Sequence, residues 1–166
     1  AGINTRIVRR SNALLDFQYG RDFRYDEAVM LSKKISSTSA KIRGSLMGSL
    51  QPMLSVGLVR TLVKPFLPSP GEGPNSKERK NGFYDMRFLA QHPSDKEKNI
   101  LAKVYGDMDP GYGSTSKMLA ESALCLVNDK LEKGGGIWTP SSLMGKQLFE
   151  RLESNAGLSF SIVDQN

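Results

Sequence analysis

Apolar and polar residues alternate in two short stretches near the middle of the chain, as they do in half-buried β-strands. In YDMRFLA (residues 84–90) every second residue from Tyr84 onward is apolar or aromatic, and ILAKV (residues 100–104) places Ile100, Ala102 and Val104 on one face. The polar segment HPSDKEKN lies between them and contains the only histidine, His92. This pattern predicts an antiparallel hairpin near residues 83–106, with His92 in its exposed turn.

Apolar residues recur at helical spacing elsewhere and predict helices at about residues 26–64, 114–133 and 141–154, the first with interruptions. The second helix is expected to bury a stripe made of Leu119, Ala123, Leu126, Val127 and Leu131. Residues 5–15 (TRIVRRSNALL) and the final LSFSIVD are interpreted as strands, and residues 67–82 as a loop. The expected fold class is α+β: a mixed, largely antiparallel sheet packed by these helices, in a single domain spanning residues 1–166.

Composition limits the chemistry that the chain can carry. Its 166 residues are 39% hydrophobic and 24% charged, which are values of a globular domain. The single cysteine, Cys125, excludes an internal disulfide and is predicted to be a buried thiol because its neighbours are apolar. One histidine and one cysteine do not form a convincing metal site, so no metal is predicted.

The net charge of +6 is unevenly distributed. Residues 1–64 carry 11 Lys/Arg against 4 Asp/Glu (+7), and residues 65–166 carry 12 against 13 (−1). Residues 44–67 contain no acid and have an amphipathic pattern, but Pro52 and Arg60 interrupt any apolar run of membrane-spanning length. This segment either packs in a core or dimer interface, or lies against lipid or an apolar substrate. An alternative function is therefore a membrane- or protein-docking module that uses the basic amphipathic region 26–64. Nucleic acid is not an expected partner, because no binding motif or basic–aromatic pattern is present.

The glycine-rich stretch VYGDMDPGYGSTSK (residues 104–117) resembles part of a dinucleotide fingerprint. That fingerprint requires a buried parallel strand before the turn and an acidic residue at the end of the next strand. Here the preceding residues alternate with Lys103 and Tyr105, as in a half-exposed antiparallel strand, so a Rossmann site is not expected. The turn would still place helix-start amides and hydroxyls next to Lys117, where they could hold a carboxylate, phosphate or carbonyl oxygen. The alternative is that these residues only cap the helix.

Three segments resemble a known family: LPSPGEGPN (67–75), GDMDPGYGSTSKMLAESALCL (106–126) and GGGIWTPSSLMGKQLFERLESNAGLSFSIV (134–163). They are similar to the C-terminal part of the saccharopine dehydrogenase-like oxidoreductases, in the branch that includes the trans-acting enoyl reductases. The resemblance implies an NAD(P)-dependent enzyme whose Rossmann domain lies in a part that is missing here. This chain would then be the substrate-binding and dimerisation lobe, inactive alone, with enoyl or other lipid-like molecules as candidate substrates.

The resemblance and the helix start together nominate a set of residues that face substrate or cofactor: Gly111, Tyr112, Gly113, Ser114, Thr115, Lys117, Trp138 and Thr139. No catalytic residue is assigned. The expected cofactor is NAD(P) in the full-length protein, with none bound by this fragment alone. The expected partners are the protein's own Rossmann domain, a second copy in a homodimer, and a small-molecule or acyl substrate. The expected location is cytoplasmic, with peripheral membrane contact as an alternative.

Overall fold

A computed structural model describes residues 2–30, 36, 38–39, 41–42, 44–45, 56–63 and 71–163. The chain divides into two compact units, residues 1–25 with 74–166, and residues 26–73. In the second unit, helix α3 (Gly57–Val63) is described, and the Thr61 hydroxyl donates to the Gly57 carbonyl at 2.9 Å. The expectation that residues 1–166 form one domain stays a prediction.

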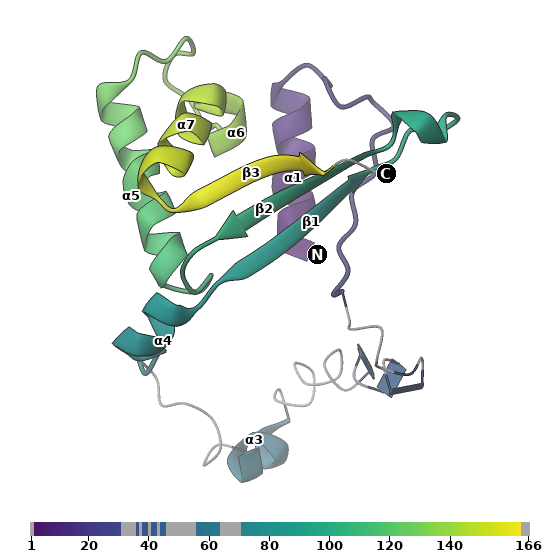
Figure 1. The fold of residues 1–166 in the computed structure, drawn as a ribbon, viewed down its shortest axis with the longest axis vertical. Coiled ribbons are helices and arrows are strands. Elements are labelled where there is room, and N and C mark those ends of the chain that lie inside the picture. Colours follow the sequence, from purple (N-terminus) through teal and green to yellow (C-terminus); the bar gives the residue numbers. More distant parts are fainter. Residues whose placement is uncertain are drawn as a thin grey trace. The chain divides into compact units, whose positions relative to one another are not determined.

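The first unit contains a three-stranded antiparallel sheet in the order β1 (Tyr84–Ala90), β2 (Ile100–Gly106), β3 (Leu158–Val163) (Figure 1). The predicted hairpin is confirmed as β1 and β2, in a register that pairs Met86 with Val104. A short 3-10 helix, Lys96–Lys98, lies in its turn. The His92 imidazole Nδ1 accepts a hydrogen bond from the Asp95 amide at 3.1 Å, so the histidine helps to form this turn. The prediction that His92 lies in the exposed turn is confirmed.

The two faces of the sheet differ in polarity. The register places a set of apolar residues on one face: Met86, Phe88, Ile100, Ala102, Val104, Phe160 and Ile162. The opposite face carries a charged group in which Asp85 contacts Arg87 at 2.7 Å and Lys103 at 3.2 Å. The hydrogen bond from Arg87 is the main reason that the pKa of Asp85 is lowered to about 2. A sheet with one apolar and one polar face needs a second layer on the apolar side.

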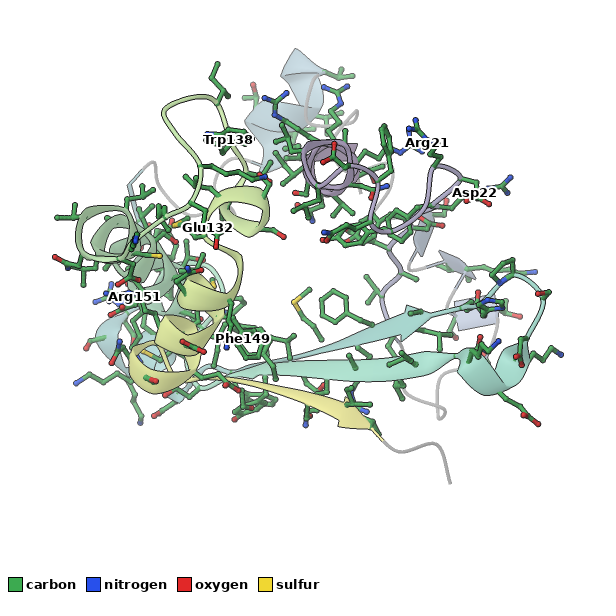
Figure 2. The ribbon with its side chains drawn as sticks, turned by 90° about the horizontal axis from the view of Figure 1, so that it is seen from above. Arg21, Asp22, Glu132, Trp138, Phe149 and Arg151 are labelled. Atoms are coloured by element: carbon green, nitrogen blue, oxygen red, sulfur yellow. The ribbon has the colours of Figure 1, made fainter. Side chains whose placement is uncertain are left out.

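Helix α7 (Gly145–Asn155) supplies part of that layer, since it contacts β3 and also packs against α5 (Gly113–Asn128) and α6 (Pro140–Leu143). The core lies between α5 and α7, where Cys125 is completely buried beside Met144 and Leu148. Phe149 of α7 points toward the sheet, and its ring centroid is 4.4 Å from that of Phe160 (Figure 2). The α+β class and the burial of Cys125 are therefore confirmed.

The strand predicted at residues 5–15 is wrong, because α1 (Gly2–Leu14) is a helix. The Ser11 hydroxyl donates to the carbonyl of Ile7, one turn back, at 2.9 Å. The Asn12 side chain then closes the following turn by donating to the Gly20 carbonyl and accepting the Tyr19 amide. These local polar contacts favour the helix and are not visible in the pattern of apolar and basic residues.

Other predicted elements differ from the structure in their bounds. The predicted loop 67–82 contains helix α4 (Ser76–Asn81), which begins with a capping box formed by Asn75 and Glu78. The predicted helix 114–133 ends earlier, at Asn128, and the predicted helix 141–154 is divided into α6 and α7 at Met144. Residues 26–30 have no regular structure, and most of the remaining predicted region 26–64, including much of segment 44–67, lies outside the described residues.

The buried stripe predicted for this helix is wrong at four residues, which are exposed: Leu119, Ala123, Leu126 and Val127. Its fifth residue, Leu131, lies beyond the end of α5 and packs against the core. Leu119 is 70% exposed and Val127 is 81% exposed, because α7 packs on the other side of α5, where Cys125 lies. Within the described part of the chain, no helix has both the length and the apolar character needed to cross a membrane.

Candidate functional site

The glycine-rich turn between β2 and α5 is closed by a carboxylate from its own chain. The Asp109 side chain accepts the backbone amides of Gly111 and Tyr112 at 3.0 Å each, and that of Gly113 at 2.6 Å. A Cβ atom on Gly113 would lie 2.7 Å from the Asp109 carboxylate, so a residue without a side chain is required there. Asp109 thus occupies the position where an external anion would bind the start of α5.

The electrostatics of this turn favour an ionised Asp109. Desolvation raises the pKa of its carboxyl, but the hydrogen bonds from the amides of Gly113, Tyr112 and Gly111, with the charge of Arg79, outweigh that effect and lower the pKa. The partial positive charge at a helix N-terminus acts in the same direction. The negative charge that this helix start attracts is therefore supplied within the turn.

The hydroxyls next to the turn are also engaged. Ser114 is completely buried, and its Oγ lies 2.9 Å from the Tyr84 hydroxyl of β1. The Thr115 hydroxyl donates to the Pro110 carbonyl at 2.6 Å. Lys117 reaches the Asp107 carboxylate at 3.5 Å. Tyr112 is 58% exposed, which leaves its ring accessible to a ligand.

The other two nominated residues, Trp138 and Thr139, lie after the C-terminal end of α5. Thr139 is buried and caps α6 in a capping box with Ser142, and its Oγ1 lies 2.8 Å from the Ser11 hydroxyl of α1. The Trp138 indole donates to the Gly134 carbonyl at 3.0 Å, with the Lys133 ammonium 4.7 Å from the centre of its ring. Thr139 therefore joins α1 to α6, and Trp138 folds over the loop that precedes them.

The structure separates the nominated residues into two groups. Residues 111–117 lie at the N-terminal end of α5, and Trp138 and Thr139 follow its C-terminal end. Sixteen helical residues span about 24 Å. One small substrate cannot contact both groups, although an extended acyl chain is long enough to do so.

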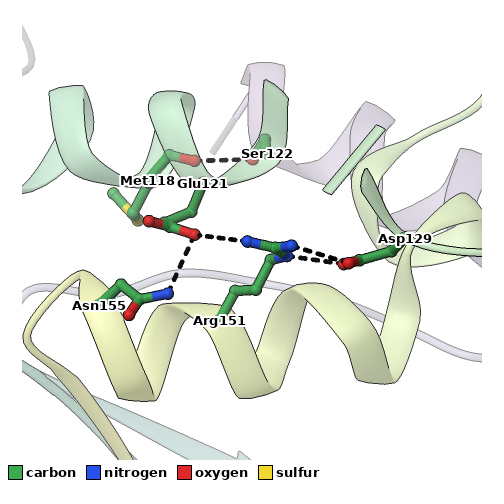
Figure 3. Close-up of polar contacts among 6 residues, drawn as sticks. All are labelled: Met118, Glu121, Ser122, Asp129, Arg151 and Asn155. Carbon is green, nitrogen blue, oxygen red and sulfur yellow. Dashed lines mark hydrogen bonds and ion pairs between the residues drawn. The ribbon is translucent and has the colours of Figure 1, made fainter. Parts of the chain in front are cut away.

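A polar network around Arg151 was not predicted from the sequence. Arg151 of α7 donates to both carboxylate oxygens of Asp129, from Nε at 2.6 Å and from Nη2 at 2.7 Å (Figure 3). Its Nη1 donates to Glu121 of α5 at 3.2 Å, and Asn155 donates to the same Glu121 oxygen at 3.2 Å. No motif in the sequence signals this network, because its members lie far apart in the chain.

The network ties the end of α5 to α7 electrostatically. The hydrogen bond from Arg151 lowers the pKa of Asp129 to about 2, and the same contact raises the pKa of Arg151. Burial raises the pKa of the adjacent Cys125 thiol, with a further contribution from the Asp129 carboxylate. Cys125 is therefore held as a neutral thiol, and the guanidinium of Arg151 is already bound on two sides.

The glycine-rich turn and the strand before it do not fit a dinucleotide. The amides of the glycine-rich turn are bound to Asp109, and the strand before it is the middle strand of an antiparallel sheet instead of a parallel one. A pyrophosphate site of the Rossmann type needs free amides at the start of a helix that follows a parallel strand. In the described ranges, histidine, cysteine, aspartate and glutamate also form no group of three that could hold a metal ion.

Comparison with known proteins shows that the sequence is similar to several proteins that carry the same name. A provisionally named trans-acting enoyl reductase of Mycobacterium tuberculosis is 40% identical over 165 residues, which cover 96% of this chain and 39% of that protein. The trans-acting enoyl reductases of Mycobacterium ulcerans and Mycobacterium bovis are each 37% identical, over 155 and 158 residues, covering 90% and 92% of this chain and 36% and 37% of theirs. This chain thus spans about two fifths of the length of the curated relatives that it matches. No family model matches the chain, and no solved structure shows significant similarity to it.

Proposed function

We propose that this chain is the substrate-binding and dimerisation lobe of an enoyl-related oxidoreductase that takes its hydride from NAD(P)H bound by another part of the longer protein. The observation that carries this proposal is the similarity to proteins named trans-acting enoyl reductase, which extends over 90% or more of the chain. The nicotinamide supplies the hydride when the cofactor is bound, and the lobe supplies contacts to the substrate.

Two features of the described part support its assignment as a lobe and not as a complete reductase. The one turn with a glycine pattern suited to phosphate is filled by Asp109. Only five hydrophobic residues of the described part are buried: Cys125, Met144, Leu148, Ala156 and Leu158. An enoyl thioester needs an apolar surface for its chain and a polar group near its carbonyl. Tyr112, which is 58% exposed, and the partly exposed Trp138 remain the accessible candidates.

Titration of a trans-2-decenoyl thioester of N-acetylcysteamine into the ¹⁵N-labelled chain tests the substrate part of this proposal. We expect saturable amide shifts at residues 111–117 or around Trp138, and weaker binding of a short crotonyl thioester, because less apolar surface is buried. Tyr112→Ala or Trp138→Ala, depending on which amides shift, should lower the affinity. If saturating thioester shifts no amide in either group, the assignment of these residues is wrong.

The docking alternative depends on region 26–64, which lies largely outside the described residues, and it stays a prediction. Cosedimentation with anionic vesicles at low and high salt separates it from the lobe function. Binding that is strong at low salt and lost at high salt would support an electrostatic docking module.

A further inference from the structure

Three arginines lie on the exposed side of helix α1. Arg6, Arg9 and Arg10 are all exposed, and α1 contains no acidic residue. The arginines of β1 and α7 differ, because Arg87 and Arg151 are each bound by an aspartate, at 2.7 and 2.6 Å. Within the described ranges of the chain, no ion pair involves an arginine of α1. The positive charge of this helix is therefore open to an anionic partner.

The loop that precedes α6 adds to the same surface. Arg10 donates from Nη2 to the Ile137 carbonyl at 2.8 Å, and the Lys133 ammonium donates to the Leu14 carbonyl at the end of α1 at 3.2 Å. These contacts hold the loop against α1, in one compact unit, and α6 lies beside the same helix (Figure 1). Residues 133–138 contribute a fourth cation and no acid. We call the exposed side of α1 together with residues 133–138 the α1 surface.

Large apolar side chains lie among these cations. Ile3 is 79% exposed, Ile7 48% and Ile137 83%. Ile3 and Ile7 are one helical turn apart on α1, and Arg10 follows at the next turn. Trp138 is partly exposed, with the Lys133 ammonium 4.7 Å from the centre of its ring. The α1 surface thus combines protruding aliphatic groups, an aromatic ring and positive charge.

An anionic lipid surface fits both properties. Arginine guanidinium groups bind phosphate oxygens strongly, and a basic amphipathic helix can lie in the plane of a bilayer with its apolar side chains below the headgroups. Tryptophan is also enriched at this depth. Nucleic acid would match the charge but would leave the isoleucines in water. An acidic protein would need hollows shaped for Ile3 and Ile137, whereas a fluid lipid boundary accepts protruding side chains without a matching shape.

We propose that the α1 surface docks this chain on anionic lipid. The arginines of α1 contact headgroup phosphates, and Ile3, Ile7 and Ile137 enter the boundary between headgroups and acyl chains. This contact is peripheral, in keeping with the absence of a membrane-spanning helix from the described part of the chain. The α1 surface is separate from region 26–64 and from residues 111–117, so the proposal goes beyond the proposed function and does not depend on it.

Cosedimentation with vesicles of phosphatidylglycerol and phosphatidylcholine in equal parts tests the charge contribution. The wild-type chain should bind at low salt and be released at high salt. The double variant Arg6→Gln/Arg9→Gln should bind roughly tenfold more weakly or worse, because each cation near an anionic bilayer changes the affinity roughly fivefold. Its charge-matched control is Lys77→Gln/Lys80→Gln on α4, where both lysines are exposed, and this variant should bind like the wild type.

Serine substitutions test the apolar contribution. Ile3→Ser and Ile137→Ser should each weaken binding, because less apolar surface leaves water. Both side chains are highly exposed, so the melting temperature should stay unchanged. Ile162→Ser is the matched control, a 72% exposed isoleucine on the sheet, and should leave binding unaffected. Equal effects at all three positions would contradict the assignment to the α1 surface.

Trp138 is the only tryptophan of the chain and therefore reports on this surface directly. Its fluorescence should shift to shorter wavelength when anionic vesicles are added, and lipids brominated on the acyl chains should quench it. Vesicle binding with unchanged Trp138 emission, or binding that Arg6→Gln/Arg9→Gln leaves intact, would overturn the proposal and assign the contact to another segment such as region 26–64.

Poly-L-glutamate serves as the probe for an acidic protein partner. A wild-type chain that binds this polymer through Arg6 and Arg9 but does not bind the vesicles would also overturn the proposal, since the occupant would then be an acidic protein. These assays contain neither thioester nor nucleotide, so lipid docking and the reductase role can fail separately.

Discussion

The Asp109 carboxylate occupies the glycine-rich turn where a phosphate would otherwise bind. A Gly-x-Gly before a helix suggests a phosphate cradle, but here one carboxylate accepts all three amides of residues 111–113. Gly113 is needed because the carboxylate stands where its side chain would be. The glycine pattern could be found in the sequence, whereas the folding of Asp109 back onto the turn depends on backbone torsions that the pattern does not specify.

Replacing Asp109 by Asn should destabilise the start of α5. An amide side chain retains only one acceptor oxygen, so at least one of the three amide hydrogen bonds is lost together with the favourable charge. We expect a melting temperature lower by a few degrees and faster hydrogen exchange at Gly111, Tyr112 and Gly113. Asp107→Asn is the control, because that carboxylate makes one ion pair at 3.5 Å and should have a smaller effect. An unchanged melting temperature and unchanged exchange would show that the turn does not depend on this cap.

The contact between Arg151 and Asp129 predicts a specific dependence of stability on pH. The pKa of Asp129 is lowered to about 2 in the folded chain, against about 3.9 in an unfolded one, so the contact stabilises the fold above about pH 4. That contribution is lost as the pH falls from about 4 to about 2, because Asp129 becomes protonated in the folded state.

Urea unfolding of the wild type and Arg151→Met between pH 6 and pH 2.5 measures this contribution. We expect the variant to be less stable at pH 6 and the difference in unfolding free energy to narrow as the pH approaches 2.5. The low pKa of Asp85, caused by Arg87, affects both proteins equally and cancels in the difference. A difference that is constant over this range would mean that Arg151 contributes through packing alone.

At the scale of elements, the sequence predicts those helices and strands that local residue patterns determine. The hairpin β1–β2 follows from alternation, and strand β3 follows from LSFSIV after a helix stop. Helix α4 could also have been predicted, since Asn75 and Glu78 have the spacing of a capping box. The buried side of α5 could not be predicted, because its apolar residues occur on more than one face. Only the contact with α7 places Cys125 in the interior.

The connection from α7 to β3 requires a glycine. Gly157 has a φ of +72°, and a Cβ there would collide with the Asp107 carboxylate. Gly157→Ala should therefore lower the unfolding free energy by about 1–3 kcal/mol. Gly134→Ala, which has no neighbour within 4 Å of its added Cβ, is the control and should be neutral or slightly stabilising. Chemical denaturation of both variants gives the comparison, and an equal effect at the two positions would contradict the account of this connection.

At the scale of the whole molecule, the described part is a small sheet and its helices with considerable apolar surface left open. The sheet has one apolar face, on which Ile162 is 72% exposed, and on α5 Leu119 is 70% and Val127 81% exposed. The relatives named enoyl reductase are about two and a half times as long as the segment that they share with this chain, since that segment is 39% of one of them. Both open surfaces agree with a lobe that functions in contact with other parts of a larger protein. The sequence could indicate this through resemblance only, because its apolar patterns do not reveal which residues stay uncovered.

Isothermal titration calorimetry of this chain with NADPH and with NADH is the most direct test of the claim that the lobe lacks the nucleotide site. The turn at residues 111–113 is occupied by Asp109, and the strand before it is antiparallel to its neighbours. We therefore predict no saturable heat with either nucleotide up to about 1 mM, far above the micromolar affinity of a formed cofactor site. A dissociation constant in the micromolar range for either nucleotide would contradict the account.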